Sequence, residues 1–183
     1  MPRQSANSEN SFGYLTAIES AGHGYFGGYL VISALGRPLE FHCTAPIRPS
    51  RAQQILYGPT LEPYLLGEQI STALLNVAKL KPCVILTDCA AAIEARDKYP
   101  SPGVLLLDNV PSDCVALPGQ FNIAAHWFQL PAGYEADEAA VVEALTQLSA
   151  HVDLAEPFGR IREAINEAQR IGGSGAEVHE QAA

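Results

Sequence analysis

Basic residues are scarce in this chain. Of its 183 residues only 11 are Lys or Arg, against 20 Asp or Glu, so the formal net charge is −9. Proteins that bind phosphate backbones rely on clusters of Lys and Arg. The one local concentration here consists of Arg37, Arg48 and Arg51. The charge balance therefore disfavours nucleic acid or an anionic membrane as a partner.

Long apolar runs are missing too. No run approaches the about 20 apolar residues that a membrane-spanning helix needs. The polar opening MPRQSANSENSF has no apolar region typical of a secretory signal. The cysteine spacings match no zinc knuckle or ribbon, and we expect reduced thiols at Cys43, Cys83, Cys89 and Cys114. We therefore expect a cytoplasmic protein without a membrane segment or a structural zinc site.

Familiar catalytic motifs are also absent. The glycine-rich stretch GHGYFGGY lacks the Lys and the Ser or Thr of a phosphate-binding loop and does not open a helix. No G-x-S-x-G elbow occurs. His42 and Cys43 are adjacent on an expected strand, so they point to opposite faces and cannot easily act on one atom together. The partners open to His42 are His23 and Glu40, and a hydrogen-bonded surface pair with Glu40 is favoured because alternation places the two on one face.

What the chain does contain is enough apolar sequence, 48%, for one domain with a core. The stretches FGYLTAIES, GYFGGYLVIS and LEFHCTAPI read as three strands joined by short connections. In the third, Leu39, Phe41 and Cys43 alternate with polar residues, which is typical of a half-buried antiparallel strand. The pattern predicts an antiparallel three-stranded meander.

Helices and buried strands follow the meander. Ser50 is expected to cap the short helix RAQQILY, which Gly58 closes, and Thr60 to cap a longer helix that Pro82 ends. CVILT and GVLLLDN read as buried strands with the helix CAAAIEARDKY between them. Strand, helix and strand over this length predict a βαβ unit with parallel strands.

The remainder of the chain predicts one strand and two helices. FNIAAHWFQL reads as the strand, and EADEAAVVEALTQLSAH and EPFGRIREAINEAQRI read as the helices. The predicted fold class is α/β: a mixed sheet with an antiparallel meander followed by a βαβ unit, with helices packed on the sheet. We expect a single domain over residues 12–171, with disordered tails at residues 1–11 and 172–183.

This order of elements over residues 12–108 resembles the ribonuclease-H-like fold, with GGYLVISALGRPLEFH as the second and third strands and VILTD as the fourth. Enzymes of that family hold two divalent metal ions with carboxylates, and two such ions can clamp a phosphodiester displacement. The resemblance implies Glu68 as the helix carboxylate and Asp88 as the strand-end carboxylate. The family has an Asp in the first strand, where this chain offers only Glu19 near the strand end.

Asp88 has two interpretations. As an N-cap, its carboxylate would accept an N–H from the helix that begins at Cys89, which is worth about 1 kcal/mol over alanine. As a member of the family's carboxylate set, it would bind metal. Capping is the favoured interpretation, and an exposed helical glutamate is the default for Glu68.

The segment PIRPSRAQQILYGPTLEPYL is the densest local signature. Its four prolines restrict the path of the chain, which would position Arg48, Arg51 and Tyr57. Arg and Tyr often anchor partners, and Arg holds anionic groups. The alternative is that the prolines only steer the chain from sheet to helix, while the arginine stems cover apolar surface.

Two functions remain open. The leading hypothesis is a non-catalytic domain that needs no cofactor and that binds another protein or a second copy of itself through Arg37, Arg48, Arg51 and Tyr57. The alternative is a metal-dependent nuclease or phosphoryl-transfer enzyme of ribonuclease-H-like fold. It would hold Mg²⁺ or Mn²⁺ with Glu19, Glu68 and Asp88.

Overall fold

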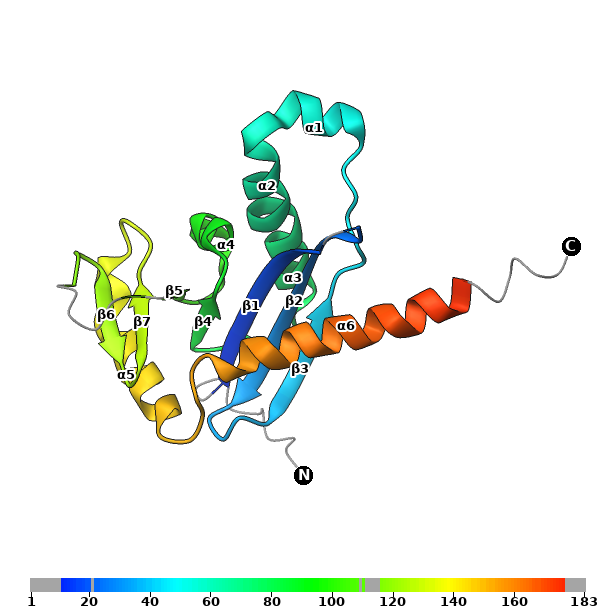
Figure 1. The fold of residues 1–183 in the computed structure, drawn as a ribbon. Helices are drawn as coiled ribbons and strands as arrows, with labels where there is room; N and C mark the ends of the chain where they lie inside the picture. The colour runs from blue at the N-terminus through cyan, green and yellow to red at the C-terminus, as the bar shows by residue number, and fades with distance from the viewer. Residues whose placement is uncertain (1–10, 21, 109, 111–115, 177–183) are drawn as a thin grey trace, which may run out of the picture.

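A computed structural model describes residues 11–20, 22–108, 110 and 116–176. Its centre is a seven-stranded mixed sheet of order β3-β2-β1-β4-β5-β7-β6 (Figure 1). The strands are β1 (Ser11–Ser20), β2 (Gly24–Ser33), β3 (Pro38–Cys43), β4 (Val84–Thr87), β5 (Gly103–Leu107), β6 (Gln120–Ile123) and β7 (His126–Gln129).

The expected meander is present. β1 pairs antiparallel with β2 over its whole length, and β2 pairs antiparallel with β3. On β3, the expected pair forms between His42 Nε2 and Glu40 Oε1 at 2.7 Å. The Glu40 carboxylate also accepts two backbone N–H groups, from Lys79 and Leu80, at 2.8 Å each. Glu40 therefore ties the outer strand to the chain that leads into β4.

The expected βαβ unit is also present. β4 runs parallel to both β1 and β5, and the short helix α4 (Ala90–Glu94) lies in the crossover from β4 to β5. Parallel strands end at one edge of a sheet, and open α/β sheets bind their ligands at that edge. We call it the carboxyl edge; it is where β4 ends at Thr87 beside β1. The ribonuclease-H-like topology expected from the order of elements is thus confirmed.

The segment expected to be one strand is a hairpin. β6 pairs antiparallel with β7, and Phe121 stacks on its cross-strand partner Phe128 with ring centroids 5.7 Å apart. The chain reverses at Ala124, whose φ of 53° is positive. Hairpin turns are usually marked by Gly, Asn or Asp at such positions. An alanine pair carries no such mark, and the single-strand prediction is wrong for that reason.

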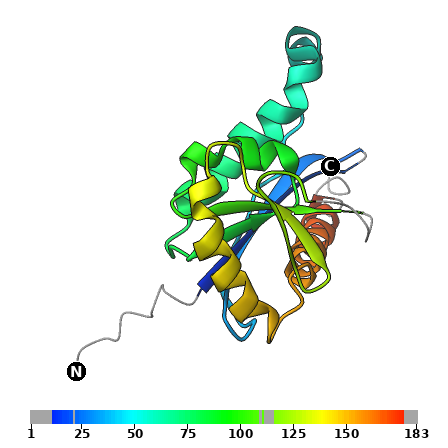
Figure 2. The same cartoon turned by 90° about the vertical axis from the view of Figure 1, so that its left-hand side faces the viewer.

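Helices cover both faces of the sheet (Figures 1 and 2). One face carries α5 (Glu138–Ser149) and α6 (Glu156–Ala176), and its core includes Tyr14, Leu86 and Phe158. The other carries α4 and the helical run after residue 60. That run comprises α2 (Leu61–Pro63), the π-helical turn segment η3 (Tyr64–Ile70) and α3 (Ser71–Val77).

One of the two expected helix N-caps is present, and the other is not. Ser50 caps α1 (Arg51–Tyr57) in a reciprocal capping box with Gln53, as predicted. Gly58 follows with a φ of 51°, but its ψ of −128° is not the left-handed helical value. Thr60 does not cap, because its backbone is already helical and its hydroxyl donates instead to the Tyr57 carbonyl. α1 and α2 are therefore joined by a short turn, η2 (Gly58–Thr60), rather than separated by a break.

The predicted tails fall mostly outside the described residues. Residues 1–10 and 177–183 lie outside them, whereas Ser11 opens β1 and α6 extends through residues 172–176. Cys43, Cys83 and Cys89 are free thiols, and Cys114 lies outside the described residues. Among the helices that the structure describes, none has the length and apolar character needed to cross a membrane.

Candidate functional site

Asp88 lies at the carboxyl edge, directly after β4. In the pairing of β1 with β4, Leu15 is opposite Thr87, so Thr16 and Asp88 follow side by side on neighbouring strands. Side chains alternate along a strand. Asp88 therefore shares a face with the core residues of β4 that lie under α6, and its side chain is only 7% exposed.

A cation reaches Asp88 from the C-terminal helix. α6 lies across this face of the sheet because Phe158, Ile161 and Ile165 are buried against it. Arg162, which follows Ile161, directs its Nη2 to Oδ2 of Asp88 in a close ion pair. The Arg162 side chain is 43% exposed, so it contacts both the carboxylate and solvent.

Burial dominates the electrostatics of Asp88. Removal from water raises the pKa of the carboxyl group, while the nearby Thr16 hydroxyl and the Arg162 guanidinium lower it without overcoming burial. The Thr16 hydroxyl lies near the carboxylate, but its oxygen has no hydrogen-bond partner within the part of the chain that the structure describes. Arg162 therefore compensates a carboxylate that burial would otherwise leave with a large desolvation penalty.

The interpretation of Asp88 as a helix cap is wrong. α4 has Cys89 at its N-cap and no side-chain cap, and the backbone N–H of Cys89 is satisfied by the Thr87 hydroxyl at 3.2 Å. Strand alternation explains the outcome. α4 packs on the face of the sheet where Cys89, Ala92 and Ile93 are buried, whereas Asp88 points to the opposite face, under α6.

The other two proposed metal ligands lie elsewhere. Glu68 is on η3, on the face opposite α6, with its side chain 60% exposed and Lys98 Nζ at 3.9 Å. Glu19 is exposed near the end of β1. Within the described part of the chain, no three His, Cys, Asp or Glu residues form a group that could hold a metal ion.

The donor set therefore does not fit the two-metal site that the family resemblance implies. Asp88 already has a cation against it, and the residue beside it on β1 is a neutral threonine rather than an acid. Hard divalent ions need several oxygen ligands, usually with carboxylates among them. The described residues at the carboxyl edge therefore do not form a two-metal centre.

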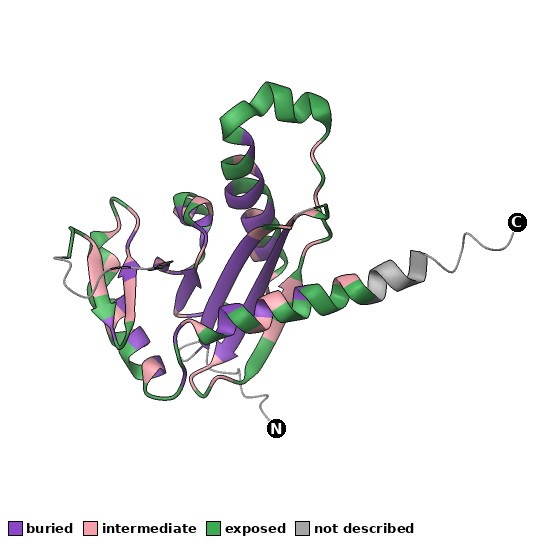
Figure 3. Cartoon of the chain, in the orientation of Figure 1, coloured by how far each residue is buried: buried purple, intermediate pink, exposed green. Residues whose placement is uncertain are grey.

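The predicted binding residues do not form one surface. Arg48 lies at the start of β2, where its Nε donates to the His23 carbonyl at 3.1 Å. Arg37 lies at the other end of β2, next to Ser33. Arg51 and Tyr57 are on α1, whose residues are all exposed and which stands away from the sheet (Figure 3). Arg48 is thus at the end of the sheet where Asp88 lies, and Arg37 is at the opposite end.

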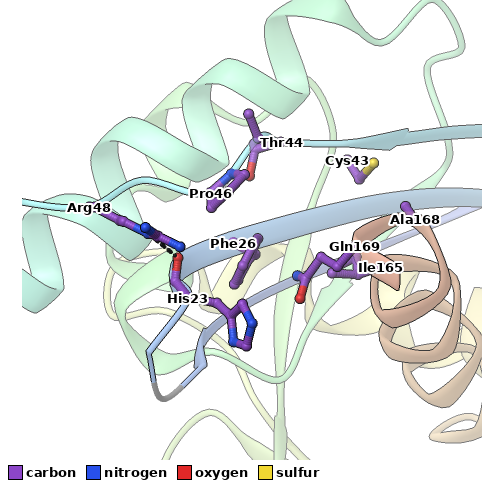
Figure 4. A pocket seen from close by; sticks show the side chains of 10 residues that line it. His23, Phe26, Cys43, Thr44, Pro46, Arg48, Ile165, Ala168 and Gln169 are labelled. Carbon is purple, nitrogen blue, oxygen red and sulfur yellow. Dashed lines mark hydrogen bonds between the residues drawn. The ribbon is translucent and has the colours of Figure 1, made fainter. Parts of the chain in front are cut away.

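A cavity opens along α6 beyond Arg162. It has a volume of about 460 Å³, and Phe26, Cys43, Pro46 and Ile165 form much of its apolar lining (Figure 4). Arg48 lies on the opposite side of this cavity from α6 (Figure 4). The cavity therefore lies between the apolar side chains of α6 and Arg48 in the segment before α1.

Sequence reasoning missed Arg162 and Thr16, although a signal for Arg162 exists. Phe158, Ile161 and Ile165 recur at the spacing of the apolar stripe of a helix, and Arg162 borders that stripe on a helical projection. A cation beside a buried stripe needs an acidic partner on the surface it meets. Asp88 is that partner, but only the tertiary arrangement identifies it.

Comparison with known proteins gives structural matches alone. No protein-family model matches this chain, and no curated protein matches it in sequence. The solved structures that resemble it include endonuclease V from three organisms. The Bacillus subtilis protein is 12% identical, with a TM-score of 0.47, over 94% of this chain and 84% of that one. The human protein is 14% identical, with a TM-score of 0.49, over 91% and 87%.

The third structure is endonuclease V from Ciona intestinalis in complex with a 23mer DNA that contains an inosine. It is 16% identical to this chain, with a TM-score of 0.39, over 60% of this chain. The chain spans about half of that protein, 48% of its length. At such identities the likeness concerns the fold.

Two predictions are overturned by these matches. The leading hypothesis of a non-catalytic protein-interaction module is wrong, since the matched structures are nucleases and agree better with the alternative. The expectation that charge disfavours nucleic acid is also wrong, since a matched structure contains DNA. Net charge is a property of the whole surface, whereas a binding site depends on local charge.

Proposed function

We propose that this chain acts on nucleic acid and binds a phosphodiester backbone at the carboxyl edge, where Arg162 contacts phosphate. The half-exposed side chain of Arg162 carries the proposal. It has five N–H donors, and among the described residues the structure pairs it with Asp88 alone. The N–H groups that do not bind Asp88 can therefore donate to phosphate oxygens in the forked geometry that arginine favours.

Asp88 acts through Arg162 in this proposal and is a positioning residue. Arginine side chains have many rotamers, and a phosphate must otherwise order them on binding. The ion pair with a buried carboxylate holds the guanidinium at the edge before the ligand arrives. Pre-organisation of this kind lowers the entropic cost of binding.

Arg48 supplies a second contact. It is exposed at the same end of the sheet, and its Nε is held by the His23 carbonyl. Arg48 lines the cavity, and Arg162 is on α6, the helix that borders it. Two held arginines suit a ligand with repeated negative charges, such as a nucleic-acid strand, better than a ligand with one. The proposed binding surface consists of Arg162, Arg48 and the edge between them.

The test is fluorescence anisotropy with labelled single-stranded DNA, single-stranded RNA and duplex DNA at 50 mM and 200 mM salt. Losing a charge-assisted hydrogen bond costs about 1.5–3 kcal/mol, so the variant Arg162→Ala should bind roughly 10- to 150-fold more weakly. Arg170→Ala is the matched control, since Arg170 is on the same helix, 80% exposed and paired with Glu167. It should change affinity by less than about twofold.

A further variant separates binding from folding. Arg162→Ala alone leaves Asp88 buried without its cation, whereas Arg162→Ala with Asp88→Asn removes both charges. Equal loss of affinity in the two variants supports a contact with phosphate. No binding of wild-type protein to any of the three nucleic acids, or equal effects of Arg162→Ala and Arg170→Ala, would overturn the proposal. Cleavage of the same substrates with Mg²⁺ or Mn²⁺ is scored in parallel.

A further inference from the structure

At the carboxyl edge, the described part of this chain does not have the set of carboxylates that the ribonuclease-H-like fold implies. In the ribonuclease-H-like arrangement implied by the sequence, acids at neighbouring strands β1 and β4 meet at the carboxyl edge. In this chain β1 contributes Thr16, which is fully buried beside Asp88. A hydroxyl carries no charge, so one carboxylate remains where the family arrangement has at least two.

The cation at this carboxylate comes from the protein. Arg162 makes a direct ion pair with Asp88, and α6 is held in place by the buried Phe158, Ile161 and Ile165. A glycine on β2 allows α6 to approach the sheet closely. A Cβ on Gly28 would overlap the Ile161 side chain, so the glycine lets α6 lie directly on the strand. Arg162 is thus placed by packing and does not merely reach in from solvent.

A divalent ion at the same position would meet two obstacles. The guanidinium would repel it, because both are positive, and Thr16 would supply only a neutral oxygen. The one charge of Asp88 is already balanced by the one charge of Arg162. A phosphate, in contrast, would meet the solvent side of Arg162 with the opposite charge.

We infer that Arg162 is the resident cation of this site, in place of the divalent ions that such folds hold there, and that the site takes a phosphate-bearing ligand without a metal ion. The identity of the ligand rests on the proposed function; the replacement of the metal does not. The inference disagrees with the Mg²⁺ or Mn²⁺ requirement expected from the fold resemblance, and the disagreement follows from Thr16 and Arg162.

The first test measures the binding of Mn²⁺ to wild-type protein. The two methods are isothermal titration calorimetry and electron paramagnetic resonance, which detects the free ion. We expect no stoichiometric site tighter than about 1 mM, on the scale of weak oxygen-ligand sites. Nucleic-acid binding should be the same, within twofold, in EDTA and in Mg²⁺. Stoichiometric Mn²⁺ binding that Asp88→Asn abolishes, or binding of nucleic acid that EDTA abolishes, would overturn the inference.

The second test reverses the replacement. Thr16→Asp with Arg162→Ala restores an acid on β1 and removes the cation, so this variant should gain one Mn²⁺ site, and adding Asp88→Asn should remove it. Thr146→Asp with Arg170→Ala makes the same change in net charge on exposed positions of α5 and α6 and should gain none. Equal Mn²⁺ binding by these two variants contradicts the inference.

The outcomes of the two proposals can be distinguished. If wild-type protein binds no nucleic acid, the proposed function fails, while the Mn²⁺ titrations still decide whether Arg162 has replaced a metal ion. If wild-type protein binds nucleic acid only with Mg²⁺, the proposed function holds and this inference fails. If the Thr16→Asp variant does not fold, the wild-type titrations alone decide.

Discussion

Removing Arg162 and removing Asp88 should change the free energy of unfolding by different amounts. Asp88 is nearly buried, whereas Arg162 is about half exposed. Arg162→Ala leaves an uncompensated carboxylate in the interior, while Asp88→Asn leaves a cation that water can solvate. The asymmetry follows from desolvation, because a buried charge without a partner is far more costly than an exposed one.

The magnitude can be estimated from the pair. Two unit charges about 4 Å apart attract by about 4 kcal/mol at an effective dielectric of about 20. Solvent on one side of Arg162 weakens this attraction, so we expect Arg162→Ala to lower the free energy of unfolding by about 2 kcal/mol at pH 7. For Asp88→Asn, the lost attraction and the removed desolvation penalty are opposed, and we expect a change within about 1 kcal/mol.

The assay is urea denaturation of both single variants and the double variant from pH 4 to pH 8. Burial raises the pKa of Asp88, so the carboxylate disfavours folding increasingly as pH rises from its unfolded value through its folded value. Arg162→Ala should raise this pKa further, so its penalty should be largest at neutral pH and shrink as Asp88 becomes protonated. Equal destabilisation by the two single variants, or a pH-independent penalty, would refute the reasoning.

Two further predictions concern packing and the outer strand. Gly28→Ala should lower the free energy of unfolding by about 2 kcal/mol, because its Cβ would overlap Ile161, and a thermal melt should show it. Gly159 is on α6 itself, and no described atom lies within 4 Å of the position of an added Cβ, so Gly159→Ala should instead stabilise by up to about 1 kcal/mol. Burial raises the pKa of Glu40, but hydrogen bonds from His42 and two backbone amides outweigh it, so the net pKa is lowered. Glu40→Gln should therefore cost about 2 kcal/mol at pH 7, and the cost should disappear as pH falls through the lowered pKa; a constant difference in urea denaturation from pH 7 to pH 3 would contradict this.

Local sequence determined most of the elements. Alternation of apolar and polar residues defined the meander, and two short apolar runs on either side of a helix defined the parallel strands β4 and β5. The serine cap of α1 was also readable, because Ser50 and Gln53 stand at capping-box spacing. These signals work because strand alternation, the pairing of consecutive strands and helix initiation depend on residues close together in the chain.

Only the tertiary structure decided the site. Asp88 and Arg162 are 74 positions apart, and their contact depends on which face of the sheet α6 covers. The same is true of the hairpin, whose turn at Ala124 has no marker residue. A capping aspartate and a buried ion-pair partner have the same local sequence, because both follow a strand and precede a helix. What distinguishes them is the packing of a helix from the far end of the chain, which places a cation over one face of the strand and leaves the helix that follows Asp88 on the other.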